Sequence, residues 1–338
     1  MKAVHIEKPG TIALVNMPVP KPKTGEALLK IKYCGICGSD AATFTGNQPF
    51  TTYPRIPGHE FSAEIVEIGA NDRDLKQGML VTAVPYFNCG VCYACRRGRT
   101  NCCEQNETMG VQRDGSFAEY IVMPVNKIVD GKGLPADILA LIEPFSISRH
   151  AVTRGRIQKG DNVLVIGAGP IGMFAMLAAK EKGARVYIAD LVEGRLELAK
   201  RLGADGTINT GKEDMSASVK EITAGGGMDV CIEAAGLPQT FLACIEQACF
   251  GGQIILIGNG KKETTFNHSL LLKKELDVFG SRNSRNDFEP LIELVARGAV
   301  DIKPLITDVF PFTSVIEAFR KVTANDGTSA KVLVSFEG

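Results

Sequence analysis

Four cysteines in one short segment form the most specific chemical pattern of this 338-residue chain. They follow the spacing Cys89-x2-Cys92-x2-Cys95-x7-Cys103, in a segment rich in Gly and Arg. Four thiolates without a histidine or carboxylate suit a closed tetrahedral zinc site, which staples a loop and leaves no open coordination position. The pattern therefore predicts a structural zinc ion. By spacing alone, Cys102 could replace Cys103 as the fourth ligand.

A second possible ligand set is dispersed along the chain and consists of Cys37, His59, Glu60 and Glu143. A catalytic zinc ion takes about three protein ligands and keeps one position open for water or substrate. Taken singly, these residues are uninformative: His59 could be an ordinary structural histidine, and Glu143 could end a strand or cap a helix. Cys37 also forms a C-x-x-C pair with Cys34, but no βαβ pattern surrounds it, which disfavours a thioredoxin-type redox site.

A glycine-rich turn, Gly167-Ala168-Gly169-Pro170-Ile171-Gly172, follows a predicted strand and opens a predicted helix. Gly167 allows the tight turn, Gly169 lets the backbone approach a pyrophosphate, and Gly172 permits close packing of helix and strand. The N–H groups at the start of the helix, with Pro170 and Ile171, then face the phosphates. This context predicts a dinucleotide site.

Asp190 ends the next predicted strand, 18 residues after Gly172. A carboxylate there accepts hydrogen bonds from the adenosine ribose and repels a 2′-phosphate, so we expect NAD rather than NADP. Arg195 could serve a 2′-phosphate, or it could cover the adenine face from the following helix. Further candidates for cofactor contact stand at or after the ends of later strands, and they are Ala235, Ile257, Gly258 and Ser281.

Composition limits the possible functions and partners. The 38 basic and 38 acidic residues cancel and form no block of like charge, which removes the electrostatic case for a nucleic-acid or acidic-membrane partner. The first residues contain no apolar signal core, and no run approaches the roughly 18 apolar residues of a spanning helix. We therefore expect a cytoplasmic protein, where a reducing environment favours metal or catalytic roles for cysteine over disulfides.

The elements that position these residues change character along the chain. A length of 338 residues predicts two domains. Residues 1 to about 140 contain short β runs broken by Gly and Pro, at 27–33, 61–68 and 79–84. From Asn162 strands and helices alternate: strands at 162–166, 185–189, 228–233, 253–257 and 276–279, and helices at 171–182, 193–202 and 239–249.

This alternation predicts right-handed βαβ units and a doubly wound parallel sheet. Three cysteines, Cys231, Cys244 and Cys249, fall on apolar positions there and are expected in the core. The tail predicts helices at 288–297 and 314–323 and a strand at 331–336. That strand cannot easily extend the parallel sheet, so we expect it to return to the first domain.

Taken together and in order, these motifs resemble the zinc-containing medium-chain dehydrogenases over essentially the whole chain. The matching segments are Cys37-Gly-Ser-Asp40, Gly58-His59-Glu60, the four-cysteine loop, Glu143-Pro144 and Gly167–Gly172. Within that family, three further segments resemble the bacterial sugar-acid (L-gulonate and L-galactonate) 5-dehydrogenases. These segments are Asn47–Phe50, Gly98–Cys103 and Gly280–Asn283.

The resemblance implies an α/β protein with a GroES-like catalytic domain (1–144 and 284–338) and an NAD-binding Rossmann domain (145–283). It implies two zinc ions per chain and selects Cys103 as the fourth structural ligand. Cys37 and His59 match catalytic ligands, and Glu60 matches a carboxylate that ligates directly or alternates with water. Glu143 occupies a third-ligand position that is cysteine in many alcohol dehydrogenases. A homo-oligomer, dimer or tetramer, is also implied.

Ser39 matches the hydroxyl that begins a proton relay from the substrate. Many relatives carry a histidine five residues after the catalytic cysteine, where this chain has Ala42. The relay must therefore end in a ribose hydroxyl, in water or in another side chain, and a threonine dehydrogenase is disfavoured.

The expected reaction is oxidation of a secondary alcohol to a ketone with NAD, at C5 of a hexonate such as L-gulonate or L-galactonate. Arg282 is the leading candidate to bind the substrate carboxylate, and Arg113 a weaker one. Arg282 could instead pair with a neighbouring acid at an interface. An uncharged polyol or diol is the alternative substrate, whereas the intact ligand set disfavours a zinc-free quinone reductase or a non-catalytic nucleotide sensor.

Overall fold

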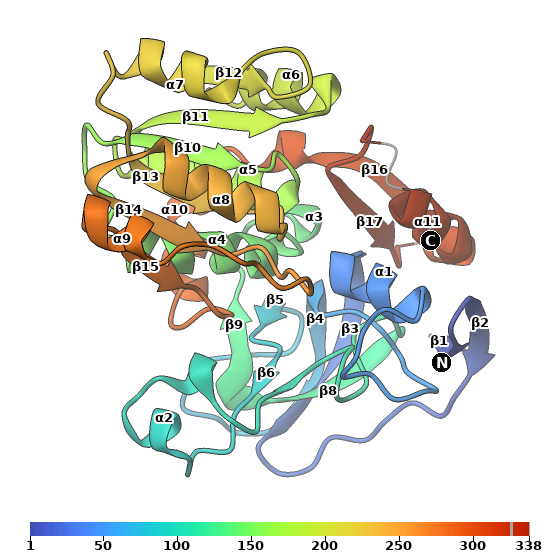
Figure 1. Ribbon diagram of the computed structural model, residues 1–338. Helices are drawn as coiled ribbons and strands as arrows, with labels where there is room; N and C mark the ends of the chain where they lie inside the picture. Colours follow the sequence, from blue (N-terminus) through green and yellow to red (C-terminus); the bar gives the residue numbers. More distant parts are fainter. Residues whose placement is uncertain (325–326, 338) are drawn as a thin grey trace. The chain divides into compact units, whose positions relative to one another are not determined.

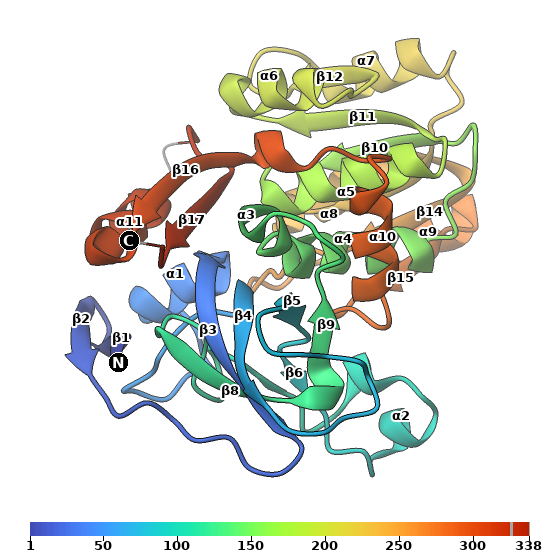
Figure 2. The ribbon, with the colours of Figure 1, turned by 180° about the vertical axis from the view of Figure 1, so that it is seen from behind.

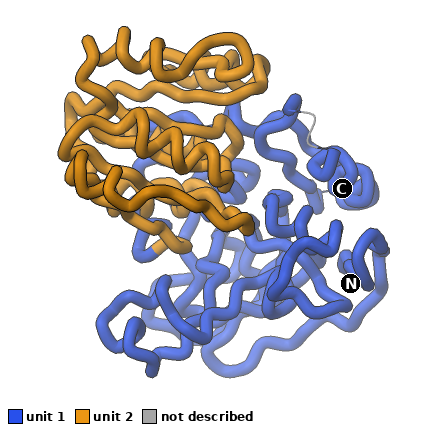
Figure 3. The backbone as a smooth tube through the Cα atoms, in the orientation of Figure 1, with its two compact units in different colours: residues 1–143, 285–338 blue, residues 144–284 orange. Residues whose placement is uncertain are grey.

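The computed structural model describes residues 1–324 and 327–337, and its backbone divides into two compact units (Figure 3). Unit 1 comprises Met1–Glu143 and Arg285–Gly338, and unit 2 comprises Pro144–Ser284. The two boundaries between the units, after Glu143 and before Arg285, each differ by one residue from the domain boundaries expected from the sequence.

Unit 1 is built on a seven-stranded sheet of order β16-β17-β3-β4-β5-β9, with β8 paired to β3 outside that path. Neighbouring strands are antiparallel except β16 and β17. The seven strands are β3 (Glu26–Gly35), β4 (Glu60–Ile68), β5 (Leu80–Ala83), β8 (Tyr120–Pro124), β9 (Ile128–Asp130), β16 (Ile306–Pro311) and β17 (Lys331–Ser335). Two small antiparallel pairs accompany it: β1 (Lys2–Lys8) with β2 (Thr11–Asn16), and β6 (Tyr86–Phe87) with β7 (Glu107–Thr108).

The C-terminal strand confirms the expected return to the first domain. β17 pairs antiparallel with β3, placing Val334 opposite Cys34. Four of its five residues are buried, so its apolar side chains complete the core that the N-terminal strands leave open. The core also joins helix to helix: Phe319 lies edge-on to Phe44 and to Phe117, with ring centroids 6.1 and 5.4 Å apart.

Short helices complete unit 1, and most of them lack a predictive period because they have only about one or two turns. They are α1 (Gly38–Phe44), α2 (Tyr93–Arg96), α3 (Ala136–Leu139), α10 (Phe288–Ala296) and α11 (Val315–Ala324). α1 lies beside α11, as Figure 1 shows. Both α10 and α11 were predicted from the sequence within one residue at each end.

Unit 2 contains a six-stranded, entirely parallel sheet of order β12-β11-β10-β13-β14-β15. Its strands are β10 (Asn162–Ile166), β11 (Arg185–Asp190), β12 (Gly206–Asn209), β13 (Met228–Glu233), β14 (Ala248–Leu256) and β15 (Asp277–Gly280). Its helices are α5 (Pro170–Glu181), α6 (Glu193–Arg201), α7 (Met215–Ile222), α8 (Pro238–Gln247) and α9 (Ser269–Lys274), and α4 (Ile142–Arg154) spans the junction. Figures 1 and 2 show α5 and α6 on one face of the sheet and α7 and α8 on the other. The doubly wound parallel sheet is thus confirmed.

Two details of unit 2 differ from expectation. The helix predicted to run through Cys249 ends at Gln247, because β14 begins at Ala248. Cys249 is therefore a half-buried strand residue, whereas Cys231 and Cys244 are fully buried as expected. Glu246 and Gln247, the last residues of α8, are common within helices, so they did not mark the boundary. Four elements were not predicted, namely α4, β12, α7 and α9.

Within the described residues, no helix is long and apolar enough to cross a membrane.

Candidate metal and cofactor sites

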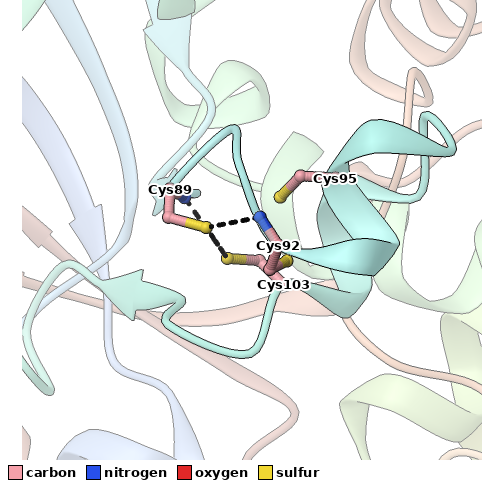
Figure 4. Close-up of side chains that lie close together, drawn as sticks. All are labelled: Cys89, Cys92, Cys95 and Cys103. Carbon is pink, nitrogen blue, oxygen red and sulfur yellow. Dashed lines mark hydrogen bonds between the residues drawn. The ribbon is translucent and has the colours of Figure 1, made fainter.

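The four cysteines of the loop before β7 come together in unit 1. The sulfur atoms of Cys89, Cys92, Cys95 and Cys103 all lie within 4.8 Å of one another (Figure 4). Cys92 precedes α2 and Cys95 lies in that helix, so one helical turn spaces the two thiols on the same side. Among the described residues, all ten cysteines are free thiols.

Backbone N–H groups point at these sulfurs. The N–H of Cys89 donates to Cys103 Sγ (3.2 Å), and the N–H of Cys92 donates to Cys89 Sγ (3.4 Å). The N–H groups of Glu104 and Cys95 lower the pKa of Cys92 to about 6, whereas burial raises the pKa of Cys95 to about 12. A cluster of thiols whose negative charge is already solvated by backbone donors fits a tetrahedral zinc ion.

Three of the four residues in the second predicted ligand set lie close together. Ligand atoms of Cys37, His59 and Glu60 lie within 4.8 Å of one another. Cys37 precedes α1, and Glu60 opens β4 directly opposite Gly35 of β3. A Cβ at Gly35 would stand 2.4 Å from Glu60 Oε2, so glycine there makes room for the carboxylate. A thiolate, an imidazole and a carboxylate in one half-buried to buried group fit a zinc ion with an open position.

Asp40, in the first turn of α1, holds both ligand-bearing loops. It is fully buried and accepts hydrogen bonds from the N–H groups of Cys37 (2.9 Å) and Gly58 (2.8 Å). Its Oδ1 also lies 3.9 Å from His59 Nδ1. Burial lowers the pKa of His59, but the charges of Cys37 and Asp40 outweigh it and raise this pKa well above its ordinary value. Asp40 therefore acts on the imidazole through its charge, because the 3.9 Å separation is too long for a hydrogen bond and His59 Nδ1 has no hydrogen-bond partner among the described residues.

Glu143 is not a member of that group, and it accepts a hydrogen bond from Tyr86, a residue that the sequence did not single out. The Tyr86 phenol donates a hydrogen bond to Glu143 Oε1, in the first turn of α4. Burial is the main cause that raises the pKa of Glu143 to about 7 and the pKa of Tyr86 well above its ordinary value. The protonated phenol thus remains the donor and restrains the carboxylate.

Lys331 is a second residue that sequence patterns missed. Its ammonium donates to Glu60 Oε2, and the two side chains are only 3% and 1% exposed. Burial lowers the pKa of Lys331, but the Glu60 carboxylate outweighs it and the pKa is raised. A lysine opening an otherwise apolar buried strand was the available signal, although nothing in it identifies the partner.

Ser39, expected to contact the substrate hydroxyl, is the second residue of α1. Its Oγ is buried and has no hydrogen-bond partner among the described residues. A buried hydroxyl without a partner is costly unless a ligand completes its hydrogen bonds.

The glycine turn of unit 2 has the geometry that a dinucleotide requires. Gly167 has φ +108°, and a Cβ at Gly172 would stand 1.8 Å from Gly167 O, so both positions need glycine. A Cβ at Gly169 would meet nothing within 4 Å, which leaves the space before α5 open for a phosphate.

Asp190 ends β11 beside this turn. It accepts hydrogen bonds from the N–H groups of Ala168 (2.7 Å) and Val192 (2.9 Å), and it lies 3.7 Å from Arg195 Nη1. The other expected cofactor residues follow the carboxyl ends of later strands: Ala235 after β13, Ile257 and Gly258 after β14, and Ser281 after β15. Carboxyl ends of parallel strands form the ligand-binding edge of such a sheet.

The two candidate substrate arginines lie in different units. The Arg113 guanidinium lies 3.6 Å from the Phe87 ring centroid and 3.5 Å from Glu107. Because it already pairs with a carboxylate of the chain, a substrate would have to displace Glu107. Arg282 is exposed and follows β15 in unit 2.

Two family models match the chain. The alcohol dehydrogenase GroES-like domain matches residues 23–134, and the zinc-binding dehydrogenase model matches residues 170–297. The L-galactonate-5-dehydrogenase of Escherichia coli K12 is 38% identical over 338 residues, covering 99% of each chain.

Solved structures resemble the whole chain as well. An alcohol dehydrogenase from Escherichia coli CFT073, complexed with NADH, is 33% identical with a TM-score of 0.94, covering 99% of each chain. A protein from Sinorhizobium meliloti 1021 bound to NADP is 30% identical with a TM-score of 0.89, covering 99% of this chain and 98% of its own.

Proposed function

The chain belongs to the zinc-binding alcohol dehydrogenases with a GroES-like domain, and from that premise we propose that it oxidises C5 of a hexonate with NAD. The substrate would be L-gulonate, L-galactonate or a close relative, and the product a keto acid. The observation that carries this choice is the 38% identity to an L-galactonate-5-dehydrogenase across 99% of both chains.

Cys37, His59 and Glu60 would hold the catalytic zinc ion, and the four-cysteine cluster the structural one. The 4.8 Å grouping supports Glu60 over Glu143 as the third ligand, although each carboxylate has a side-chain partner, Lys331 for Glu60 and Tyr86 for Glu143. A zinc ion held there would supply Lewis acidity toward the substrate hydroxyl, and a bound nicotinamide would supply a hydride acceptor.

The chain's own residues then orient the reactants and move the proton. Ser39 Oγ, which has no hydrogen-bond partner among the described residues, would take the proton of the substrate hydroxyl while passing its own hydroxyl proton on to a ribose hydroxyl, water or another side chain. Asp40 holds the backbone of Cys37 and Gly58, next to two of the proposed ligands. Lys331 balances the charge of Glu60, which limits the negative charge at the site.

NAD is proposed over NADP because of Asp190. Its carboxylate stands beside the glycine turn, where a 2′-phosphate would meet a like charge. Both cofactors occur among similar solved structures, so the preference is a property to be measured on this chain.

A substrate screen monitored by NADH formation tests the proposal. L-gulonate, L-galactonate and other hexonates should be oxidised with higher kcat/KM than sorbitol and simple diols. Cys37→Ser protein serves as the control for background reduction. A wild type that prefers sorbitol over every sugar acid would show a polyol dehydrogenase instead.

A further inference from the structure

Glu233, the last residue of β13, is a buried carboxylate to which the reaction so far assigns no task. Its side chain is 3% exposed. Its Oε1 accepts three hydrogen bonds, from the N–H groups of Ala235 (3.0 Å) and Gly236 (2.8 Å) and from Thr240 Oγ1 (2.7 Å). One oxygen therefore fixes the whole turn between β13 and α8.

The same residue also ties that turn to the end of β14. The Glu233 carbonyl accepts the N–H groups of Ile257 and Gly258, both at 3.0 Å. A Cβ at Gly258 would stand 2.4 Å from Glu233 Oε2 and 2.3 Å from Gly236 N. The two turns are thus in contact through Glu233, with no room for another atom.

The turn after β13 that Glu233 holds lies next to the glycine turn after β10. A Cβ at Gly167 would stand 3.0 Å from Ala235 N, so the turn after β13 packs directly on the glycine turn after β10. Asp190 lies on β11, on the other side of β10 from β13. A dinucleotide crosses such a sheet at the point where strand order reverses. If its adenosine half lies at Asp190, its nicotinamide half must extend over β13 and β14.

We propose that Glu233 is a positioning residue for the nicotinamide half of the cofactor. Its carboxylate fixes the backbone of the turn after β13 by hydrogen bonds and packs against Gly258 of the turn after β14, so that both turns present a preformed surface to the nicotinamide half. This inference rests on the proposed use of a nicotinamide dinucleotide and adds a residue that neither the glycine motif nor Asp190 includes.

Equilibrium binding without turnover tests the proposal, with NADH and ADP as two ligands measured on the same protein. ADP carries only the adenosine half and phosphates. Glu233→Ala leaves the N–H groups of Ala235 and Gly236 unpaired, whereas Thr240 Oγ1 can still donate to Leu237 O. The NADH Kd should therefore rise about tenfold while the ADP Kd stays within about twofold. Glu233→Gln keeps an acceptor oxygen and should recover most of the NADH affinity.

Asp229, on the same strand, provides the matched control. Its carboxylate also binds a backbone N–H, that of Asn162 at 2.7 Å, but at the amino end of β13. Asp229→Asn should leave both dissociation constants within about twofold, since this end of the sheet does not bind the ligand. Asp190→Ala should weaken ADP and NADH together.

Equal weakening of ADP and NADH by Glu233→Ala, or no weakening of NADH, would overturn the proposal. If Glu233→Ala does not fold, Thr240→Val decides: it removes one donor and should weaken NADH about threefold without affecting ADP. If the wild-type protein binds NADH but oxidises no sugar acid, only the hexonate assignment is wrong. A wild type that binds no NADH removes both.

Discussion

The ammonium of Lys331 donates a hydrogen bond to Glu60 Oε2, although the two residues are 271 positions apart. Lys331 opens the C-terminal strand β17 and Glu60 opens β4, and both side chains are almost fully buried. Each charge is tolerated in the interior because the other is present. Lys331, in the C-terminal strand, thus balances the charge of one member of the group that Cys37, His59 and Glu60 form.

In the metal-free protein, Lys331→Met should reduce stability by about 3–5 kcal/mol, because it leaves the Glu60 charge buried without its partner. Lys32→Met is the matched control: Lys32 lies 2.8 Å from Glu64 in a partly exposed pair of the same sheet. That loss should remain below about 1 kcal/mol. Urea unfolding measures the free energy of unfolding that each variant loses. Equal losses would show that burial does not make the Lys331–Glu60 pair more stabilising than the partly exposed Lys32–Glu64 pair.

Cys103→Ser should remove the structural metal ion and lower Tm by about 5 °C or more, because the ion cross-links its loop only when all four thiolates bind. Cys102→Ser should retain two zinc ions per chain, since Cys102 lies outside the thiol group. Elemental analysis and thermal melts measure both quantities. If Cys102→Ser lost the structural ion and Cys103→Ser retained it, Cys102 would be the fourth ligand in place of Cys103.

Cys37→Ser should reduce the zinc content from about two ions to one and abolish turnover, because it removes a thiolate ligand of the catalytic set. The melting curve should change little, since Cys37 is only half-buried and Asp40 still holds the loop. Retained turnover with one zinc ion per chain would place the catalytic metal elsewhere.

Asp190→Ala should lower kcat/KM for NAD by roughly 10- to 100-fold and narrow the preference over NADP, because ribose hydrogen bonds and repulsion of a 2′-phosphate are both lost. Glu197→Ala, which changes an exposed acid on the following helix, should leave the NAD/NADP ratio unchanged. A wild type that already prefers NADP would contradict the cofactor assignment.

Arg282→Ala should cost roughly 2–4 kcal/mol in kcat/KM for a hexonate, if its guanidinium binds the carboxylate through two parallel hydrogen bonds. The cost should be much smaller for an uncharged polyol of the same length. Arg113→Ala should have a smaller effect, because Glu107 already occupies that guanidinium. Equal losses on acid and polyol would remove Arg282 from the substrate site.

Local patterns in the sequence were sufficient for the parallel sheet and the ligand motifs. β10 and β13 have the predicted bounds, because a run of apolar residues ending at a glycine turn or a carboxylate is a strong strand signal. The four-cysteine spacing and the glycine turn are short-range as well, so one helical turn or one loop is enough to bring their members together. Short elements such as β12 and α1 carry too few residues for a period to be recognised.

By itself, the sequence determined which residue types could bind metal and dinucleotide, and which domain each belonged to. Only the tertiary structure places Glu60 within 4.8 Å of Cys37 and His59, and only it pairs Glu143 with Tyr86 and Glu60 with Lys331, which lie 57 and 271 positions away along the chain. Such pairings follow from strand order and packing rather than from local spacing. A hydrogen bond between buried side chains is specified by the fold that removes both from water, and no pattern along the chain records it.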